Sequence, residues 1–273
     1  MKNKSVSITK SNQLMSASYF LTAEEQRLIL ACISKVNPLE DGGLLSNKKF
    51  YITASEFRQL FKERKNVDVY KVLQNVSKKL YQRSFTLKSN GFVIESRWVS
   101  EVGYHKDKGM VHLAFSPEVI NHITSLKRNF TSYKLLNVRN MESIYGIRIY
   151  ELIIKVIPSK TALNFRISDL KNILGIDGKY SKVNDLKRKV LDQAKKDINK
   201  YSDLYFDYKP IKEGQRIIGF TLLFKEKPES EKPQQAVQQI ANQLPDLSDD
   251  FTDFSEIEIN DANGDWLVDD IDF

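Results

Sequence analysis

A twenty-residue run, SKVNDLKRKVLDQAKKDINK (Ser181–Lys200), carries side chains that could bind DNA. Arg, Lys and Asn donate hydrogen bonds to phosphates and to base edges in the major groove. Asn184 and Arg188 lie near the start of the run, the part that a helix-turn-helix protein inserts into the groove. We therefore expect these two residues to read bases. The further DNA-binding candidates are basic residues of the run and of the segment after it: Lys182, Lys187, Lys195, Lys209, Lys212 and Arg216.

The same run has a second, apolar face, and its spacing occurs twice in the chain. Val183, Leu186, Val190 and Ala194 are spaced by three, four and four residues, which places them on one side of an α-helix. An earlier set with the same spacing is Val69, Val72, Val76 and Leu80. The polar face of this earlier helix is plainer, and its DNA-binding candidates are Lys71, Asn75 and Lys78.

Similar elements surround both helices and indicate the fold. A strand-like run and a short helix come before each one, at residues 51–61 and 165–174. An alternating stretch typical of a β-hairpin follows each one, at residues 85–99 and 204–224. This order is that of a winged helix-turn-helix domain. We therefore predict an α+β protein with two tandem winged helix-turn-helix domains and a disordered acidic C-terminal tail.

Local signals divide the chain into four parts. We expect a polar arm at residues 1–18, a first domain at 19–127, a second at 128–227 and a tail at 228–273. The capping-box pattern from Thr22 to Glu25 predicts where the first helix begins, and Ser116 and Pro117 predict another helix start. A further amphipathic helix is predicted at Met141–Ile157.

The charges are distributed unevenly along the chain. Residues 228–273 hold thirteen acids and one base, whereas residues 1–227 hold 41 bases and 22 acids. The basic excess of the first part attracts polyanions such as nucleic acids. The alternative is that the lysines only keep the surface soluble, and the basic helices are then ordinary solvated helices.

Enzymatic chemistry has weaker support in the sequence. A rolling-circle nickase needs a tyrosine nucleophile beside a metal that two closely spaced histidines hold. Tyr201 and Tyr205 are four residues apart, but the chain contains no His-x-His pair and no phosphate-binding GxxxxGK[ST] loop. We expect no catalytic residue, no metal site and no cofactor. Tyr201 and Tyr205 are expected in the wing and the core.

Other features concern the compartment. No apolar run approaches the roughly 20 residues that a membrane helix needs, and no secretory signal is visible at the start. The single cysteine, Cys32, cannot form an intrachain disulfide, which fits a reducing compartment. We expect a cytoplasmic protein with Cys32 buried in a helix.

Five motifs resemble those of a known family. They are LMSASYFLTAEEQRLI (Leu14–Ile29), SRWVSEVGY (Ser96–Tyr104), FTSYKLLNV (Phe130–Val138), YGIRIYELI (Tyr145–Ile153) and GFTLLFK (Gly219–Lys225). In this order and at these distances they are similar to the Rep initiator proteins of theta-replicating, iteron-containing bacterial plasmids. The resemblance covers about residues 11–227.

The resemblance implies a non-enzymatic function. Members of this family bind repeated origin sequences as monomers, open nearby AT-rich DNA and recruit the host initiator, helicase or primosome proteins. Their dimers, joined mainly through the first domain, repress their own gene. The resemblance implies that the helix at 181–200 is the main reader of double-stranded origin DNA. The alternative is a winged-helix transcriptional regulator without a replication role.

The acidic tail lies outside these motifs and ends in WLVDDIDF (Trp266–Phe273). This ending is similar to the acidic tip of bacterial single-stranded-DNA-binding proteins. Apolar side chains of such a tip can fill a pocket while its carboxylates meet basic residues. The expected partner-binding residues are Trp266, Leu267, Ile271 and Phe273, with host replication proteins as partners. The alternative is a tail that solubilises the protein or folds back over the DNA-binding helices.

Overall fold

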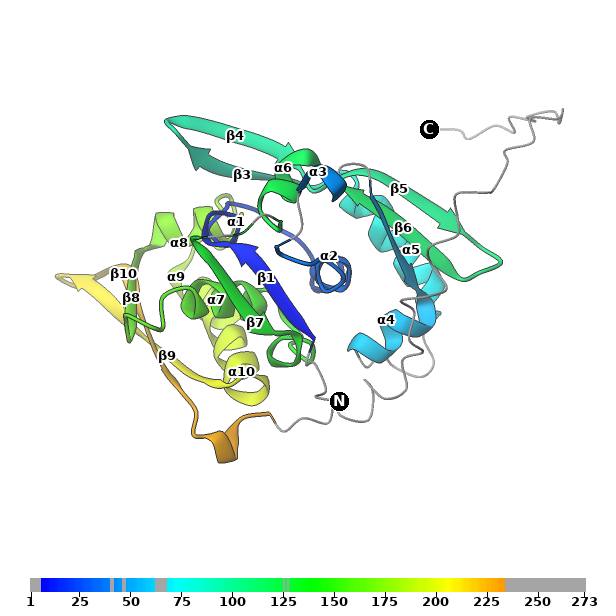
Figure 1. The fold of residues 1–273 in the computed structure, drawn as a ribbon. Coiled ribbons are helices and arrows are strands. Elements are labelled where there is room, and N and C mark those ends of the chain that lie inside the picture. The colour runs from blue at the N-terminus through cyan, green and yellow to red at the C-terminus, as the bar shows by residue number, and fades with distance from the viewer. Residues whose placement is uncertain are drawn as a thin grey trace, which may run out of the picture.

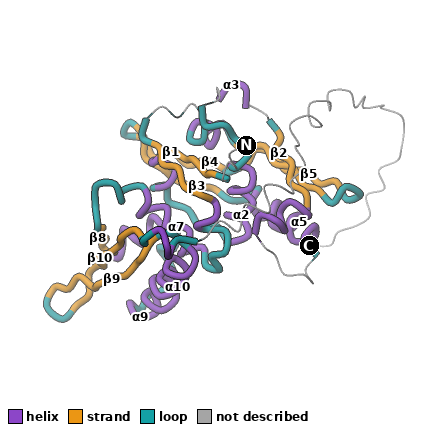
Figure 2. The backbone as a smooth tube through the Cα atoms, turned by 60° about the horizontal axis from the view of Figure 1, so that its bottom comes forward, coloured by secondary structure: helices purple, strands orange, loops and turns teal. Residues whose placement is uncertain are grey.

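The computed structural model describes residues 6–39, 42–45, 48–61, 68–124, 126 and 128–233. Two groups of helices and strands lie side by side, each with its own three-stranded antiparallel sheet (Figure 1). Their hairpins extend away from each other at opposite ends of the molecule (Figures 1 and 2). The two predicted DNA-reading helices therefore belong to separate halves that meet in the middle.

The first half has the elements of a winged helix. Strands β2 (Lys49–Thr53), β6 (Met110–Phe115) and β5 (Val99–His105) form its sheet in the order β2-β6-β5. The predicted first helix begins after Thr22, whose side chain accepts a hydrogen bond from the Glu25 amide while Glu25 accepts one from Thr22. The helices of this half are α2 (Ala23–Ile33), α3 (Gly42–Leu45), α4 (Ala54–Phe61), α5 (Val69–Leu80) and α6 (Pro117–Asn121).

The hairpin after α5 differs from the predicted wing of the first domain. Strands β3 (Ser84–Ser89) and β4 (Phe92–Arg97) do pair as a hairpin, but they form a sheet of their own. The hairpin that pairs with β2 is the next one, β5–β6. The prediction that residues 85–99 are the wing was therefore wrong. Both segments form antiparallel hairpins, and the pairing of β6 with β2 shows which of them completes the three-stranded sheet.

The second half repeats the order in a simpler form. Strands β8 (Ala162–Arg166), β10 (Arg216–Glu226) and β9 (Leu204–Glu213) form its sheet in the order β8-β10-β9. Its helices are α7 (Ile144–Ile154), α8 (Ile167–Ile173), α9 (Val183–Leu186) and α10 (Asp192–Tyr201), with a π-helical segment (Lys187–Leu191) between α9 and α10. The predicted helix at 141–157 is shorter at both ends. It begins after Ser143, which caps α7 by accepting a hydrogen bond from the Tyr145 amide, and it ends before Lys155, after which the chain forms turns.

A second two-stranded sheet lies where the halves meet. It pairs β1 (Ser7–Ser11) with β7 (Phe130–Lys134), and the short helix α1 (Asn12–Met15) follows β1. Residues 7–15, predicted to belong to a polar arm, are thus regular structure with largely buried side chains. The prediction missed this pairing because the partner strand comes about 120 residues later and leaves no local signal.

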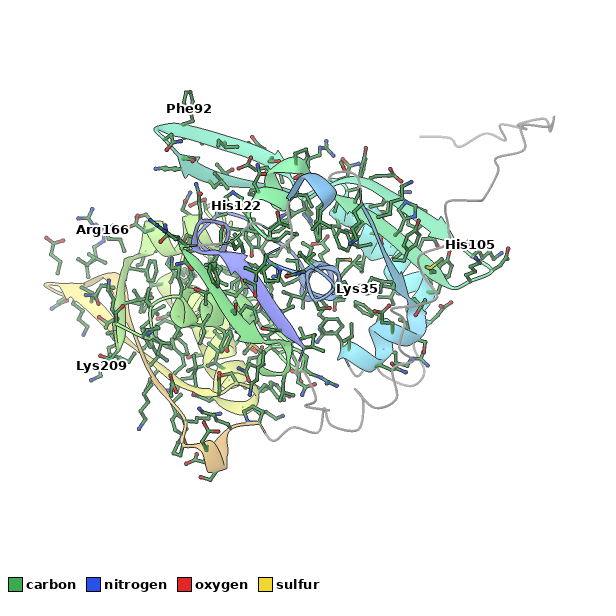
Figure 3. The ribbon with its side chains drawn as sticks, viewed as in Figure 1. Lys35, Phe92, His105, His122, Arg166 and Lys209 are labelled. Carbon is green, nitrogen blue, oxygen red and sulfur yellow. The ribbon has the colours of Figure 1, made fainter. Side chains whose placement is uncertain are left out.

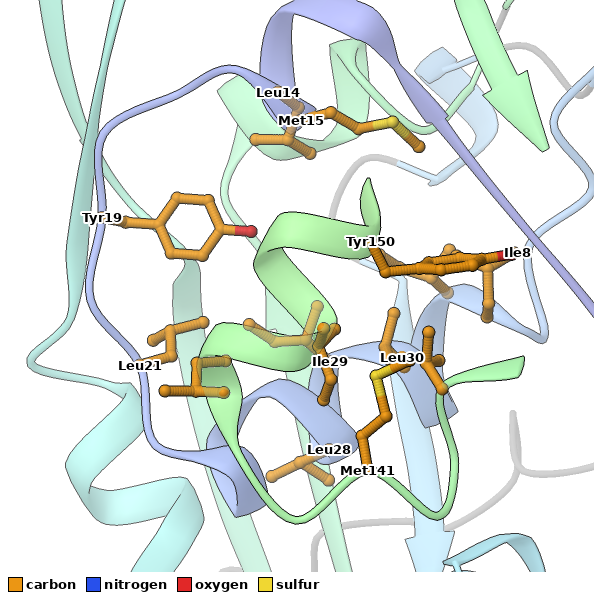
Figure 4. Close-up of a cluster of buried hydrophobic side chains, with 14 of the residues drawn as sticks. Ile8, Leu14, Met15, Tyr19, Leu21, Leu28, Ile29, Leu30, Met141 and Tyr150 are labelled. Carbon is orange, nitrogen blue, oxygen red and sulfur yellow. The ribbon is translucent and has the colours of Figure 1, made fainter. Parts of the chain in front are cut away.

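The apolar core is continuous across this junction. Figure 4 shows side chains from β1, α1, α2 and the α7 region packed together, among them Ile8, Met15, Ile29 and Tyr150. On its other side α7 packs closely on α10, where a Cβ added to Gly146 would lie 2.8 Å from the Cβ of Asp197. Helix α7 therefore holds the second half together and also joins it to the first.

Candidate nucleic-acid interface

The predicted reading helix of the second half is continuous from Val183 to Tyr201. Its inward side chains are buried: Leu186, Val190, Leu191, Ala194 and Ile198. The adjacent positions Val190 and Leu191 are both buried because the π-helical turn widens the helix by one residue. The sequence spacing did not predict this turn, which lies at Arg188. Such turns are frequent at functional sites.

Most of the predicted base-reading and phosphate-binding side chains of this helix are accessible. Lys182, Asn184 and Arg188 are exposed, and Lys187 is half-buried. The Nη2 of Arg188 lies 3.1 Å from the Oδ1 of Asp185, and the Arg188 side chain remains 73% exposed. An ion pair this exposed contributes little to stability. Arg188 can therefore leave Asp185 and bind a base or a phosphate at a small cost in free energy.

Lys195 has a different environment from the other candidates. Its Nζ lies 2.7 Å from the Oδ1 of Asp207 on β9, and this hydrogen bond lowers the pKa of Asp207. One turn earlier, the Tyr208 hydroxyl donates to Asp192 at 2.6 Å. These two contacts fasten α10 to the wing. The structure thus pairs Lys195 with an acid, and its role as a DNA contact stays a prediction.

The wing β9–β10 presents the remaining candidates. Lys212 and Arg216 are exposed beside the turn at Gly214, whose φ of 59° suits glycine, and Lys209 is exposed farther along β9, opposite Thr221. Among the described residues, none of the three has an ion-pair partner within 4.0 Å. Figure 3 shows Lys209 and Arg166 at the outer edge of the second half. Arg166 is exposed at the junction of β8 and α8. It was not among the predicted DNA-binding residues, because those were all chosen from the reading helices and the wing.

The first half presents a second candidate surface on α5. Lys71, Asn75 and Lys78 are exposed on α5, as is Gln74, while Val69, Leu73, Val76 and Leu80 are buried. A groove of about 530 Å³ separates α5 from β5, and its walls are Gln74, Asn75, Lys78, Tyr81, Gln82, Val102 and Tyr104. Tyr81 and Tyr104 are 38% and 41% exposed. Gln74 and Tyr104 were not among the predicted candidates. Tyr104 reaches the groove from β5, a strand of the hairpin that was not predicted to be the wing.

The residues of the competing enzymatic hypothesis are not brought together. Lys200 Nζ lies 4.8 Å from the ring centroid of Tyr201, and the Tyr205 hydroxyl donates to Glu231. His112 contacts Glu101 at 2.8 Å on the first sheet, whereas His122 contacts Ser11 at 2.8 Å. Within the described parts of the chain, no group of three His, Cys, Asp or Glu side chains could hold a metal ion.

Two further predictions have different outcomes. Cys32 is buried in α2, as expected, and burial raises the pKa of its thiol. The tail was predicted to be disordered from residue 228, but residues 228–233 are described and include a 3-10 helix at Glu229–Glu231. The rest of the predicted tail, with the partner-binding residues Trp266, Leu267, Ile271 and Phe273, lies outside the described residues. None of the described helices has the length and apolar character to cross a membrane.

Two winged helices in tandem, each with an exposed polar reading helix, define a class of DNA-binding protein. Residues 7–154 match the family model described as "Initiator Replication protein, WH1", and residues 166–224 match "Initiator Rep protein, WH2". The chain belongs to this initiator replication protein family. The prediction of two tandem winged-helix domains and the resemblance to plasmid Rep initiators are thereby confirmed.

Relatives of known sequence or structure agree with this assignment. An Escherichia coli "Replication initiation protein" is 27% identical over 205 residues, which cover 72% of this chain and 63% of that protein. An "Uncharacterized 27.6 kDa protein" of E. coli is 24% identical over 83% of this chain and 98% of its own length. The crystal structure of the Pi initiator protein in complex with iteron DNA matches with a TM-score of 0.68 and 21% identity, over 83% of this chain and 99% of that one. At this identity the match shows a shared fold.

Proposed function

We propose that this protein initiates plasmid replication by binding directly repeated duplex sequences, or iterons, at a plasmid origin. The observation that carries the proposal is the exposed, basic reading helix in the second of two family winged-helix domains. The name of the E. coli replication initiation protein and the iteron DNA bound by the Pi initiator support it.

The two halves have different roles in this proposal. Asn184 and Arg188 read bases from α9 and the π-helical turn, while Lys182, Lys187 and the wing residues Lys209, Lys212 and Arg216 bind flanking phosphates. The first domain, at about residues 19–127, makes flanking contacts through Lys71, Asn75 and Lys78 and supplies the dimer surface. Monomers open the origin, and dimers repress the protein's own gene.

Recruitment of host proteins completes the proposed function. The sequence of the tip, with Trp266, Leu267, Ile271 and Phe273 among aspartates, suits an apolar pocket with a basic rim. We assign its partner to the host initiator, helicase or primosome proteins. No cofactor and no catalytic residue enter this function, and the protein acts in the cytoplasm.

The decisive experiment uses a plasmid whose only initiator gene encodes this chain. Its flanking DNA is expected to contain tandem repeats of roughly 20 base pairs, the length that suits two domains on one face of the duplex. A plasmid with the gene and this DNA should replicate in a host that lacks other initiators. Deleting the repeats should abolish replication and the footprint of the purified protein. A footprint and repression without replication would instead identify a transcriptional regulator.

A further inference from the structure

Exposed basic side chains outnumber exposed acidic ones on the reading helix and wing of the second winged helix. Its reading helix and wing carry six exposed basic side chains on their N-terminal and hairpin parts: Lys182, Arg188, Lys189, Lys209, Lys212 and Arg216. Four acids lie among them: Asp185, which Arg188 and Lys189 share; Asp207, which Lys195 engages; Asp192, which accepts a hydrogen bond from Tyr208; and Glu213, opposite Arg216 at the wing turn. We call these six basic residues the reading surface. It is a site for a polyanion.

The chain itself contains a polyanion of suitable length. Residues 246–273 hold eleven acids and no Lys or Arg. The two family matches cover residues 7–154 and 166–224, so this acidic segment lies outside both of them. Its role is therefore not inherited with the winged-helix fold. Its density of about one charge per 2.5 residues makes it an electrostatic analogue of a nucleic acid strand.

The last described residues before this segment lie near the C-terminal end of the reading helix. After β10, the Nζ of Lys227 donates to the carbonyl oxygens of Asn199 at 2.6 Å and Ser202 at 2.9 Å, at the C-terminal end of α10. The Tyr205 hydroxyl then donates to Glu231, which holds the chain against the base of β9. Figure 1 shows this last described stretch directly below α10. Lys227 and Glu231 are therefore held near the end of the helix that is opposite to its reading end.

The remaining length is sufficient to cover the helix. The helix from Val183 to Tyr201 is roughly 28 Å long at 1.5 Å per residue. A disordered chain, the state that the composition predicts for the tail, spans about 20 Å over the thirteen residues from 233 to 246 and about 35 Å over forty residues. A tether of this length gives an effective concentration on the order of millimolar.

We propose that the acidic segment 246–273 binds the reading surface of its own second winged-helix domain and competes there with DNA. The competition weakens binding to all duplexes by the same factor, because the segment must leave before any DNA can enter. Binding to random sequence, which rests on phosphate contacts alone, then falls to a negligible level while iteron binding persists. DNA binding also frees Trp266–Phe273 for a protein partner.

The test compares three full-length proteins on an iteron duplex and on a random duplex. The natural chain is compared with a variant whose eleven tail acids are changed to Asn or Gln, and with a control in which residues 246–273 are shuffled at unchanged composition. We expect the neutral variant to bind both duplexes about tenfold more tightly at low salt, with the difference disappearing near 0.5 M salt as charges are screened. The shuffled control should bind like the natural chain.

A second measurement locates the contact without DNA. A photoreactive phenylalanine analogue at position Phe254 should cross-link to residues 182–216, and an excess of DNA should remove the product. Equal DNA affinities of the natural and neutral chains, or cross-links confined to the first domain, would overturn the inference. The inference rests on the proposed function, because it uses the same DNA-reading face, but the experiment distinguishes a failure of the inference from a failure of the proposed function. If even the neutral variant does not bind the iterons, it is the proposed function that is wrong.

Discussion

The ammonium group of Lys10 and the carboxylate of Glu151 lie 2.5 Å apart, and both side chains are fully buried. Lys10 belongs to β1, in the two-stranded sheet at the junction, and Glu151 belongs to α7, so this ion pair fastens the junction sheet to the second half. The Tyr133 hydroxyl donates to the same carboxylate at 2.6 Å. Arg148, one turn before Glu151, lies 3.4 Å from its other oxygen and donates to the carbonyls of Met15, Ala17 and Ile173.

Removing one partner of this pair should destabilise the protein strongly. Lys10→Met leaves the Glu151 charge buried with only Arg148 and Tyr133 to compensate it, and we expect a loss of about 3 kcal/mol in the free energy of unfolding. Urea denaturation followed by circular dichroism measures this loss. Lys134→Met on the exposed face of neighbouring β7 is the control and should cost less than about 0.5 kcal/mol. Equal losses for the two variants would contradict a structural role for the pair.

The same pair predicts a dependence of stability on pH. Burial by itself would raise the pKa of Glu151, but the charges of Lys10 and Arg148 and the hydrogen bonds from Lys10 and Tyr133 outweigh burial and lower it below its ordinary value of 4.5. The stability that a lowered carboxyl pKa supplies is present above the unfolded-state pKa and is lost as the pH falls through the folded-state pKa. The difference in unfolding free energy between the natural protein and Glu151→Gln should therefore be constant near pH 7 and shrink below about pH 4.5. A constant difference down to pH 3 would rule out this linkage.

Local patterns in the sequence predicted the parts of the fold that local physics decides. The capping box at Thr22, the helix after Val183 and the hairpin after Leu204 all lie within one or two residues of their predicted places. Each depends on side-chain periodicity or on hydrogen bonds between residues close in sequence. The accessibility of Asn184 and Arg188 followed from the same periodicity.

Long-range pairing decided the parts that the sequence did not predict. Lys10 was assigned to a polar arm because its partner Glu151 is 141 residues away. The wing of the first domain was placed one hairpin too early, which hid Tyr104. The π-helical turn at Lys187–Leu191 has no sequence signature of its own, and Lys195 looked like a free cation until β9 brought Asp207 beside it.

Base reading should be separable from phosphate binding by single substitutions. Arg188→Ala should weaken binding to the iteron by about 1–3 kcal/mol and change binding to random duplex little, because a base contact exists only on the right sequence. Lys212→Ala at the wing tip is the comparison and should weaken both duplexes alike. Fluorescence anisotropy at one fixed salt concentration measures all four affinities. A uniform loss for Arg188→Ala would make it another phosphate contact.

Salt dependence should count those phosphate contacts. Each neutralised phosphate contributes about −0.9 to the slope of log affinity against log salt, so Lys212→Ala should make the slope less steep by about one unit. The control is Lys35→Ala, whose ammonium lies 2.9 Å from Glu56 in the first half and should leave the slope unchanged. Titrations between roughly 50 and 300 mM salt give the slopes. A nearly flat dependence for the natural protein would contradict the claim that backbone contacts carry much of the affinity.

The last prediction concerns the tip of the tail. Deleting Ile271–Phe273 removes two apolar side chains and one of the eleven acids, so iteron binding should stay within about twofold while plasmid copy number falls severalfold. The matched control deletes Ala262–Gly264, three residues without an acid or a large apolar side chain, and should replicate normally. Copy number by quantitative PCR and iteron affinity by anisotropy provide the two measurements. If the tip deletion replicates normally while removal of residues 246–273 tightens DNA binding, the tail acts only as an electrostatic competitor and the recruitment role is wrong.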